Sequence, residues 1–337
     1  MKNLKFYDKV LFLINSLVAF LLLLAYILPK IPPKTFSVLS VLALGVPVLL
    51  LLNILFFFYW LFKLKKQLLL PLIVLVIGFN YLTSIYKFTG SKSVTDDSNF
   101  SIMTYNVRLF NKFNWLPDQT IDKDIKAFIQ EENPTIICLQ EYQPNDNFKL
   151  NDFYEHTYVT GNKVKNGQAI FSRYPILNSG VIKFPNSSNS AIYVDVKHVK
   201  DTIRIYNIHL QSSKLSPKVS DLQKEGSEEL TKRIGEVFKI QQSQAELVAR
   251  HQNASPYKTI LTGDFNNTAY SYVYNMLKGD LKDTFDYAGN GFGRTFSFNS
   301  IPLRIDFVLV DESFEINGFK NYDIKYSDHY PIKAILK

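Results

Sequence analysis

The sequence predicts an α/β domain with a sheet-rich core, preceded by a segment of three membrane-spanning helices. Long uncharged runs indicate the spans. From about residue 100, short runs rich in β-branched and aromatic residues alternate with polar stretches of helical character. Several of these short runs are apolar nearly throughout, as is expected of strands that are covered on both faces. The predicted divisions are a membrane anchor at 1–92 with spans at 10–29, 35–62 and 67–86, a polar linker at 93–99 and a folded domain at 100–337.

Each uncharged run is long enough to cross a bilayer, which needs about 20 apolar residues in a helix. A cleaved signal peptide followed by core helices is the alternative. The first run lacks a small-residue cleavage site and two further runs follow it, which favours a multi-pass integral membrane protein. Six lysines flank the spans on the side of the N-terminus and four on the other side. The positive-inside rule therefore predicts a cytoplasmic N-terminus in an inner or plasma membrane, with 93–337 outside the cytoplasm.

The charge of the chain is unevenly distributed. The formal net charge is +8, but the first 92 residues contain ten lysines and one acidic residue, Asp8, so the excess lies in the membrane anchor. The folded domain is close to neutral, and the basic pI therefore does not indicate a nucleic-acid partner. The single cysteine, Cys138, excludes an intrachain disulfide framework and a cysteine-based metal site.

The folded domain is predicted to contain eight strands and three helices. The first of these helices has acids in its first turn, an apolar face and a stop before Asn133-Pro134. The polar linker consists of turn-forming residues. The predicted helices occupy 118–132, 226–253 and 269–277, and the predicted strands occupy 101–107, 135–141, 168–173, 191–196, 202–210, 259–266, 304–310 and 330–336.

Polar side chains end or open most of the predicted strands. Burying such groups is costly unless they are paired or bind a metal ion. Carboxylates and amides gathered at strand ends suit a hard cation such as Mg²⁺, which prefers oxygen ligands. The residues at these positions are Asn106, Glu141, Asn207, His209, Asp264, Asn266, Asp306, Asp328 and His329.

Each of these residues also has an ordinary structural explanation. Glu141 alone would be a solvated acid at a strand end, and a lone histidine such as His209 is more often a satisfied core residue. Asp306 could accept backbone hydrogen bonds, and GDFNN could be a loop of Asx turns. These separate explanations do not account for the whole series, because successive elements each supply one group of the same chemical kind.

The motifs that hold these residues resemble the endonuclease/exonuclease/phosphatase superfamily. They are YN at 105–106, LQE at 139–141, YNIHL at 206–210, GDFN at 263–266, RIDFVLV at 304–310 and SDHYPI at 327–332, with GQAIFSRYPI at 167–176 as a further structural match. The resemblance covers roughly 100–337. It implies an α/β (α+β) fold of two packed β-sheets flanked by helices. It also implies an enzyme that hydrolyses phosphate esters with Mg²⁺, or alternatively Mn²⁺.

The resemblance assigns a metal role to three residues. It implies Glu141 as the principal metal ligand, with Asn106 beside the metal and the phosphate and with Asp328 on the metal side. Arg108 stands where abasic-site endonucleases have a second acid, which indicates that Arg108 faces phosphate instead.

Five further residues are implied to act on the phosphate and the water. Asp264 and Asn266 would contact the attacked phosphate and the nucleophilic water, and His209 would donate to a phosphate oxygen. His329 would be a general base or a phosphate-stabilising group, oriented by Asp306. Such a site supplies what hydrolysis needs, namely an activated water, stabilised phosphate charge and a histidine tuned by a carboxylate.

Two departures narrow the subgroup. Abasic-site endonucleases tend to have tyrosine at the position of His209, and inositol polyphosphate 5-phosphatases carry Cys-Asp-Arg where this chain has RIDF. The histidine-containing group with neutral sphingomyelinases and deoxyribonuclease I remains.

The sequence therefore predicts a membrane-anchored, metal-dependent phosphodiesterase. Its partners would be the bilayer and a phosphoester substrate, and no obligate protein partner is inferred. A lipid or small phosphoester fits the near-neutral domain better than long DNA, because nucleases gain affinity by neutralising phosphates. A nuclease acting on DNA or RNA is the alternative. A non-catalytic scaffold that retains the fold is a third, less favoured because the metal and base residues are all present.

Overall fold

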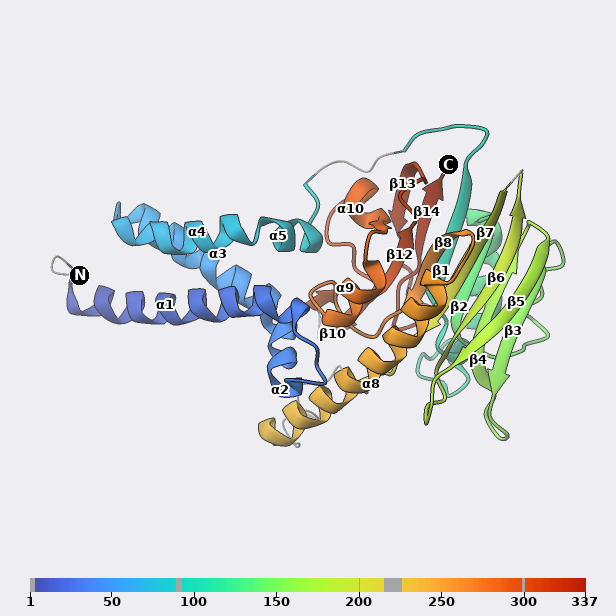
Figure 1. The fold of residues 1–337 in the computed structure, drawn as a ribbon, viewed down its shortest axis with the longest axis horizontal. Helices are drawn as coiled ribbons and strands as arrows, with labels where there is room; N and C mark the ends of the chain where they lie inside the picture. Colours follow the sequence, from blue (N-terminus) through green and yellow to red (C-terminus); the bar gives the residue numbers. More distant parts are fainter. Residues whose placement is uncertain (1–3, 89–92, 200, 215–225, 299–300) are drawn as a thin grey trace.

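The computed structural model describes residues 4–88, 93–199, 201–214, 226–298 and 301–337. Two six-stranded sheets pack face to face, helices cover their outer faces, and the N-terminal helices extend away from the sheets (Figure 1). The predicted two-sheet sandwich flanked by helices is therefore confirmed.

The first sheet has the strand order β13-β14-β1-β2-β4-β3. Strands β1 and β2 run parallel, and every other pair in this sheet is antiparallel. The strands are β1 (Phe100–Asn106), β2 (Ile136–Tyr142), β3 (Tyr154–Thr160), β4 (Asn166–Ser172), β13 (Ile316–Asn321) and β14 (Ile332–Leu336).

The second sheet has the strand order β5-β6-β7-β8-β12-β9. Its central pair, β7 and β8, is parallel, which mirrors the parallel pair of the first sheet. The strands are β5 (Ile176–Lys183), β6 (Ser190–His198), β7 (Asp201–His209), β8 (Lys258–Asp264), β9 (Lys282–Asp283) and β12 (Asp306–Val310), and a separate hairpin consists of β10 (Phe296–Phe298) and β11 (Ile301–Leu303).

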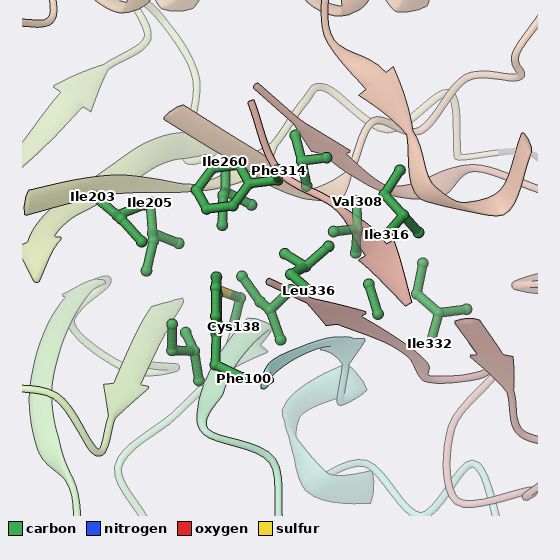
Figure 2. Close-up of a cluster of buried hydrophobic side chains, with 14 of the residues drawn as sticks. Phe100, Cys138, Ile203, Ile205, Ile260, Val308, Phe314, Ile316, Ile332 and Leu336 are labelled. Carbon is green, nitrogen blue, oxygen red and sulfur yellow. The ribbon is translucent and has the colours of Figure 1, made fainter. Parts of the chain in front are cut away.

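The core between the sheets is built from alternate residues of the central strands. Figure 2 shows apolar side chains from both sheets pointing toward one another, including Phe100 and Cys138 from one and Ile205 and Ile260 from the other. The intervening residues of β1, such as Met103, lie in a second cluster on the outer face. Because each residue of such a strand is buried on one face or the other, the strands are apolar nearly throughout.

Helices pack on the outer faces and confirm the three helical predictions. The helices α6 (Ile121–Glu132), α8 (Ser227–Asn253) and α9 (Tyr272–Lys278) lie within the predicted ranges or within one residue of them, and the short α10 (Thr284–Ala288) was not predicted. Ile121, Ile125 and Ile129 recur at helical spacing along α6 and are all buried.

All eight predicted strands are present, but six strands of the described residues escaped prediction, namely the short β9, β10 and β11 and three longer edge strands. The three longer strands are β3, β5 and β13, whose sequences YEHTYVT, ILNSGVIK and INGFKN contain polar or turn-forming residues. β3, β5 and β13 stand at sheet edges, where one side has no strand partner and solvent reaches part of the strand. Composition therefore carries little strand signal there.

Two N-terminal helical segments are long and apolar enough to cross a membrane, namely Phe6–Lys30 and Ser37–Phe62. The first contains α1 (Phe6–Ile27) and the 3₁₀ turn η1 (Leu28–Lys30), and the second contains α2 (Ser37–Ser40), η2 (Val41–Gly45) and α3 (Val46–Phe62). Polar contacts join them: Trp60 donates from Nε1 to Oδ1 of Asn15 at 3.0 Å, and Tyr59 donates to Asp8 at 2.8 Å. Buried polar pairs of this kind fix the packing of apolar helices.

The third predicted span, 67–86, is not one helix. It follows η3 (Lys66–Leu68) and consists of α4 (Leu69–Ile77) and α5 (Phe79–Ile85), which are bent by 67°. The break falls at Gly78, where an added Cβ would lie 1.9 Å from the hydroxyl oxygen of Tyr26. The ring of Tyr26 occupies this gap and stacks on Tyr81 with 4.7 Å between ring centroids. The prediction of three continuous spanning helices is therefore wrong in its third member.

The N-terminal helical segment packs against the folded domain. Helix α2 lies beside α8 (Figure 1). The backbone N–H of Lys34 donates to Oε1 of Gln242 at 2.9 Å, and its ammonium pairs with Glu246. The predicted linker at 93–99 also makes contacts, since the N–H of Val94 donates to the carbonyl of Asn317 in β13.

Candidate active site

The polar strand ends converge at one edge of the sandwich. The parallel pairs β1/β2 and β7/β8 present their carboxyl ends there, and the start of β12 joins them because β12 runs antiparallel to β8. Asp306 lies opposite Asp264 in this register, and His209 lies opposite Asp264 on the other side. The segment that precedes β14 adds Asp328 and His329.

Asp264 lies at the centre of the cluster and is buried. Its Oδ2 accepts a hydrogen bond from Nδ2 of Asn106 at 3.0 Å and lies 3.7 Å from Nε2 of both His209 and His329. Asn266, in the left-handed region with φ 50°, donates its backbone N–H to Oδ1 of Asp264 at 2.7 Å. Burial, together with the charge of Asp306, raises the pKa of Asp264 to about 6, although both histidines oppose this shift.

His329 is held by a carboxylate. Its Nδ1 lies 3.0 Å from Oδ2 of Asp306, and both side chains are almost wholly buried. Burial lowers the pKa of His329, but the carboxylates of Asp306 and Asp264 outweigh it and raise that pKa to about 10. Ligand atoms of Asp264, Asp306 and His329 all lie within 4.8 Å of one another. The imidazole is therefore a cation between two carboxylates at neutral pH.

Glu141 lies on the other side of Asn106. A β-bulge between Gln140 and Tyr142 and a left-handed backbone, with φ 48°, set the direction of the Glu141 side chain. Nδ2 of Asn106 donates to Oε1 of Glu141 at 3.2 Å, and burial raises the pKa of this carboxyl above its ordinary value. The amide oxygen of Asn106 accepts from the backbone N–H of Arg108. Asn106 thus donates to both carboxylates rather than presenting its oxygen to them.

Arg108 and Asp328 form an ion pair at the rim. Nη1 of Arg108 lies 3.2 Å from Oδ2 of Asp328, and both side chains are about one-third exposed. The guanidinium also stacks over the ring of Trp115 at 4.3 Å. A run of left-handed residues from Arg108 to Asn111 follows β1 and places the arginine here. Asp328 therefore does not orient the histidine beside it.

Two of the polar strand-end residues differ in their surroundings. Asn207 donates from Nδ2 to the carbonyls of Leu139 and Ala169 and accepts from Gln140 at 2.6 Å, so it joins the two sheets within the core. His209 is buried, and burial lowers the pKa of its imidazole. Its Nε2 lies 3.7 Å from Oδ2 of Asp264 and has no hydrogen-bond partner among the described residues.

Five of the polar residues described above border a cavity of about 280 Å³, namely Arg108, Glu141, Asn266, Asp328 and His329. Apolar side chains form the rest of its lining together with a few further polar ones, and we call them the apolar wall. Sequence reasoning missed the apolar wall and the ring of Trp115. The alternation TFSFN is a weak strand signal that could have indicated β10, whereas nothing in the sequence marked Leu44. The cavity is lined by Leu44, Arg108, Glu141, Ser212, Ser213, Lys214, Phe238, Asn266, Asn267, Thr268, Phe296, Phe298, Leu303, Ile305, Asp328 and His329.

A two-sheet sandwich with a buried His–Asp pair and acidic residues at one edge defines the class of hydrolases that act on phosphate esters. The chain belongs to the endonuclease/exonuclease/phosphatase family, whose family model matches residues 103–329. A second model, described as a domain of unknown function (DUF8431), matches residues 8–85. A comparison with curated proteins gives no match.

Solved structures share the fold of about 71–72% of this chain. A Bacteroides vulgatus endonuclease/exonuclease/phosphatase has 20% identity and a TM-score of 0.56, and the match covers 71% of this chain and 98% of that one. TDP2 of D. rerio, humanized by 14 mutations, has 16% identity and a TM-score of 0.55, with 72% and 100% covered. The human Nocturnin catalytic domain, with a bound sulfate anion, has 14% identity and a TM-score of 0.55, with 72% and 96% covered.

Proposed function

We propose that this protein is a membrane-anchored, metal-dependent phosphodiesterase whose substrate is a lipid or small phosphoester. The observation that carries the proposal is the buried His329–Asp306 pair, placed beside Asp264 and next to a cavity that Glu141 also lines. A histidine held by one carboxylate and facing a second is the equipment of proton transfer and of charge stabilisation at a phosphate.

The charges at the site divide the work between His329 and Asp264. A histidine with a pKa of about 10 is protonated at neutral pH and suits stabilisation of a phosphate oxygen, rather than abstraction of a proton. Asp264, with a pKa of about 6, suits the base that accepts the proton of the attacking water. The water oxygen then bonds to phosphorus as the ester P–O bond breaks. Asn266 and His209 flank Asp264 and would donate to the water or to a phosphate oxygen.

The acidic residues fit a hard divalent cation. Glu141 offers a carboxylate at the cavity that accepts from one amide, and Asp328 offers a second carboxylate at the same cavity. Oxygen ligands of this kind are those that Mg²⁺ prefers, and Mn²⁺ accepts them as well. We propose that Glu141 is the principal ligand, with Asp328 and the amide of Asn106 beside it. The ion would offset the negative charge of the phosphate oxygens.

The N-terminal helices support a membrane location. Lys5 and Lys9 lie at the start of α1, and Lys63 and Lys65 follow α3, at the end of the helices away from the sheets (Figure 1). Their charge favours a cytoplasmic position for that end. The catalytic domain would then lie outside the cytoplasm, in a multi-pass protein of an inner or plasma membrane. Within this proposal 1–92 is the anchor and 100–337 the catalytic domain.

A nuclease is the second candidate, because Arg108 stacks on the half-exposed ring of Trp115 beside the cavity. Paired cations and aromatic rings bind single-stranded nucleic acids through phosphates and base stacking. A solved structure of D. rerio TDP2 with 16% identity is a complex with single-strand DNA product. Against this candidate stands the near-neutral charge of the domain.

The full chain in detergent micelles separates these candidates. We would assay phosphatidylcholine, sphingomyelin, inositol phosphates, single-stranded DNA and double-stranded DNA, each with Mg²⁺ and with EDTA, and use His329→Ala as the inactive control. The proposal expects EDTA-sensitive hydrolysis of a lipid or small phosphoester. Cleavage of DNA alone would select the nuclease. Hydrolysis that survives EDTA or His329→Ala would contradict the proposed site.

A further inference from the structure

The cavity at the active site has two walls of opposite chemistry. One wall carries Glu141, Asn266 and His329 from the strand ends. The other carries phenylalanine and leucine side chains from α8, β10 and β11, with the ring of Phe296 5.0 Å from the imidazole of His329. A phosphodiester that occupies this cavity therefore meets polar groups at its phosphate and apolar groups close beside them.

Leu44 extends the apolar wall and comes from the membrane segment. It lies in η2, between α2 and α3, and it lines the same cavity as His329 although nearly 300 positions separate them in the chain. Leu44 is half-buried, so part of its side chain remains free to contact a ligand. The catalytic cavity is thus completed by a residue outside the 103–329 match.

The position of η2 is fixed by contacts of the preceding residues with α8. Lys34 anchors the start of this segment to Gln242 and Glu246 of α8. About two helical turns before Gln242 on α8, Gly235 approaches α2 so closely that an added Cβ would lie 3.0 Å from the carbonyl oxygen of Ser37. Phe238, on the same helix, lines the cavity. Helix α8 therefore holds the membrane segment and the apolar wall in one register.

The surface beside Leu44 is apolar and continues toward the spanning helices. Val38 and Leu39 of α2 and Val48 of α3 are exposed by 50%, 42% and 52%. An exposed apolar surface that continues into a membrane segment is covered by the bilayer when the segment is inserted. Lipid at this surface would lie directly beside the cavity.

We propose that η2 forms a substrate-selecting wall of the active site, in which Leu44 contacts the apolar portion of a long-chain phosphodiester presented by the bilayer. This inference rests on the proposed function and deepens it, because it names the part of the substrate that the anchor recognises. The phosphate lies at the strand ends, and the hydrocarbon portion passes along Leu44 toward the membrane. Leu44 is a specificity residue and takes no part in the chemical step.

The test measures hydrolysis of two lipid probes and one soluble probe by wild type and variants of the full chain in mixed micelles. The lipid probes are sphingomyelin and dioleoylphosphatidylcholine, and the soluble probe is bis(p-nitrophenyl) phosphate. We expect Leu44→Gln to lower kcat/KM for the lipid that wild type hydrolyses by about tenfold or more, since a lost apolar contact is worth a factor of this size. For the soluble probe we expect a change below about twofold. Leu44→Ala keeps the wall apolar and should give a smaller lipid-selective loss.

Leu177→Gln is the control, since it makes the same change at an exposed leucine of β5, which neither lines the cavity nor belongs to the apolar surface beside Leu44. An equal loss with Leu177→Gln would overturn the inference, as would equal losses on the lipid and the soluble probe or no loss with Leu44→Gln. Hydrolysis of the soluble probe but of neither lipid would overturn it and leave the proposed hydrolase intact. A wild type inactive on all three, or unaffected by His329→Ala, would refute the proposed function and this inference with it.

Discussion

Nδ1 of His329 lies 3.0 Å from Oδ2 of Asp306, which is 23 positions earlier in the chain. The carboxylate next to His329 in sequence, Asp328, pairs instead with Arg108 at 3.2 Å. The acid and the histidine of SDHYPI are therefore neighbours in sequence but not partners in the site. This separation predicts different consequences for the two aspartates.

Asp306→Asn should lower kcat by about 10²-fold or more, because the neutral amide holds the orientation of His329 less well and does not stabilise its cation. His329→Ala should lower kcat further. Since Asp306 acts through His329, the double variant should be no slower than His329→Ala alone. Steady-state kinetics with the best substrate of the panel measure all three.

Asp328→Asn serves as the comparison for that series. It removes a carboxylate one residue from His329 but leaves the contact with Asp306 intact. The loss of kcat that Asp328→Asn causes should add to that of His329→Ala in the double variant, because the two groups act separately. Additive losses for Asp306→Asn and His329→Ala would contradict the pairing.

Glu141→Gln should raise the Mg²⁺ concentration needed for half-maximal activity by at least about tenfold, because a neutral amide is a weaker ligand for a hard cation than a carboxylate. Titration of activity with Mg²⁺ after treatment with EDTA measures this. Glu155→Gln, an exposed position on β3, is the matched control and should leave the titration unchanged. An unchanged midpoint for Glu141→Gln would remove Glu141 from the metal site.

The central strands and the site were predictable from the sequence for the same physical reason. A strand covered on both faces must be apolar, so a polar residue at its end stands out, as Asp264 does after TILTG and Glu141 does after TIICLQ. Edge strands such as β5 lack this contrast because solvent reaches them. The register of an edge strand is fixed by the strand next to it in the sheet, which the sequence of the edge strand itself does not reveal.

The missed residues of the site depend on tertiary contacts. Leu44 reaches the cavity only because α2 packs on α8, and Trp115 meets Arg108 only because the left-handed run after β1 turns the chain. The bend at Gly78 likewise depends on a tyrosine about 50 positions away in sequence. Asn207 shows that a motif can also include a residue without a role in the site. It belongs to the same motif as His209, yet its contacts make it a structural residue of the core.

Asn207→Ala should therefore destabilise the fold by about 3 kcal/mol or more. Its amide donates to the carbonyls of Leu139 and Ala169 and accepts from the amide of Gln140, so the substitution would remove three buried hydrogen bonds. Thermal melting of the full chain in detergent measures the loss. Asn178→Ala, which removes one exposed amide from β5, should change stability by less than about 1 kcal/mol. Equal losses of stability for the two variants would contradict the inference that Asn207 joins the two sheets.

The last prediction concerns Glu132, which joins the end of α6 to β13 and β14. Its carboxylate accepts from Lys320 at 2.6 Å, from Lys333 and from Tyr322. Burial raises the pKa of Glu132, but these three hydrogen bonds outweigh it and lower that pKa to about 2. A carboxyl whose pKa is depressed on folding stabilises the protein above its unfolded pKa, near 4.5, and loses this contribution as the pH falls toward 2.

Glu132→Gln should therefore be less stable than wild type at pH 7 by about 1–2 kcal/mol, after allowance for solvent screening. The difference should shrink as the pH falls from 5 to 3, because Glu132 of unfolded wild type takes up a proton in this range while the folded carboxylate stays ionised, and the variant has no such group. Melting temperatures across this range measure the gap between the two proteins. Glu131→Gln, one residue earlier and exposed, removes the same charge and should follow the wild-type curve. A gap between wild type and Glu132→Gln that stays constant with pH would mean that the lysine contacts do not depend on the charge of Glu132.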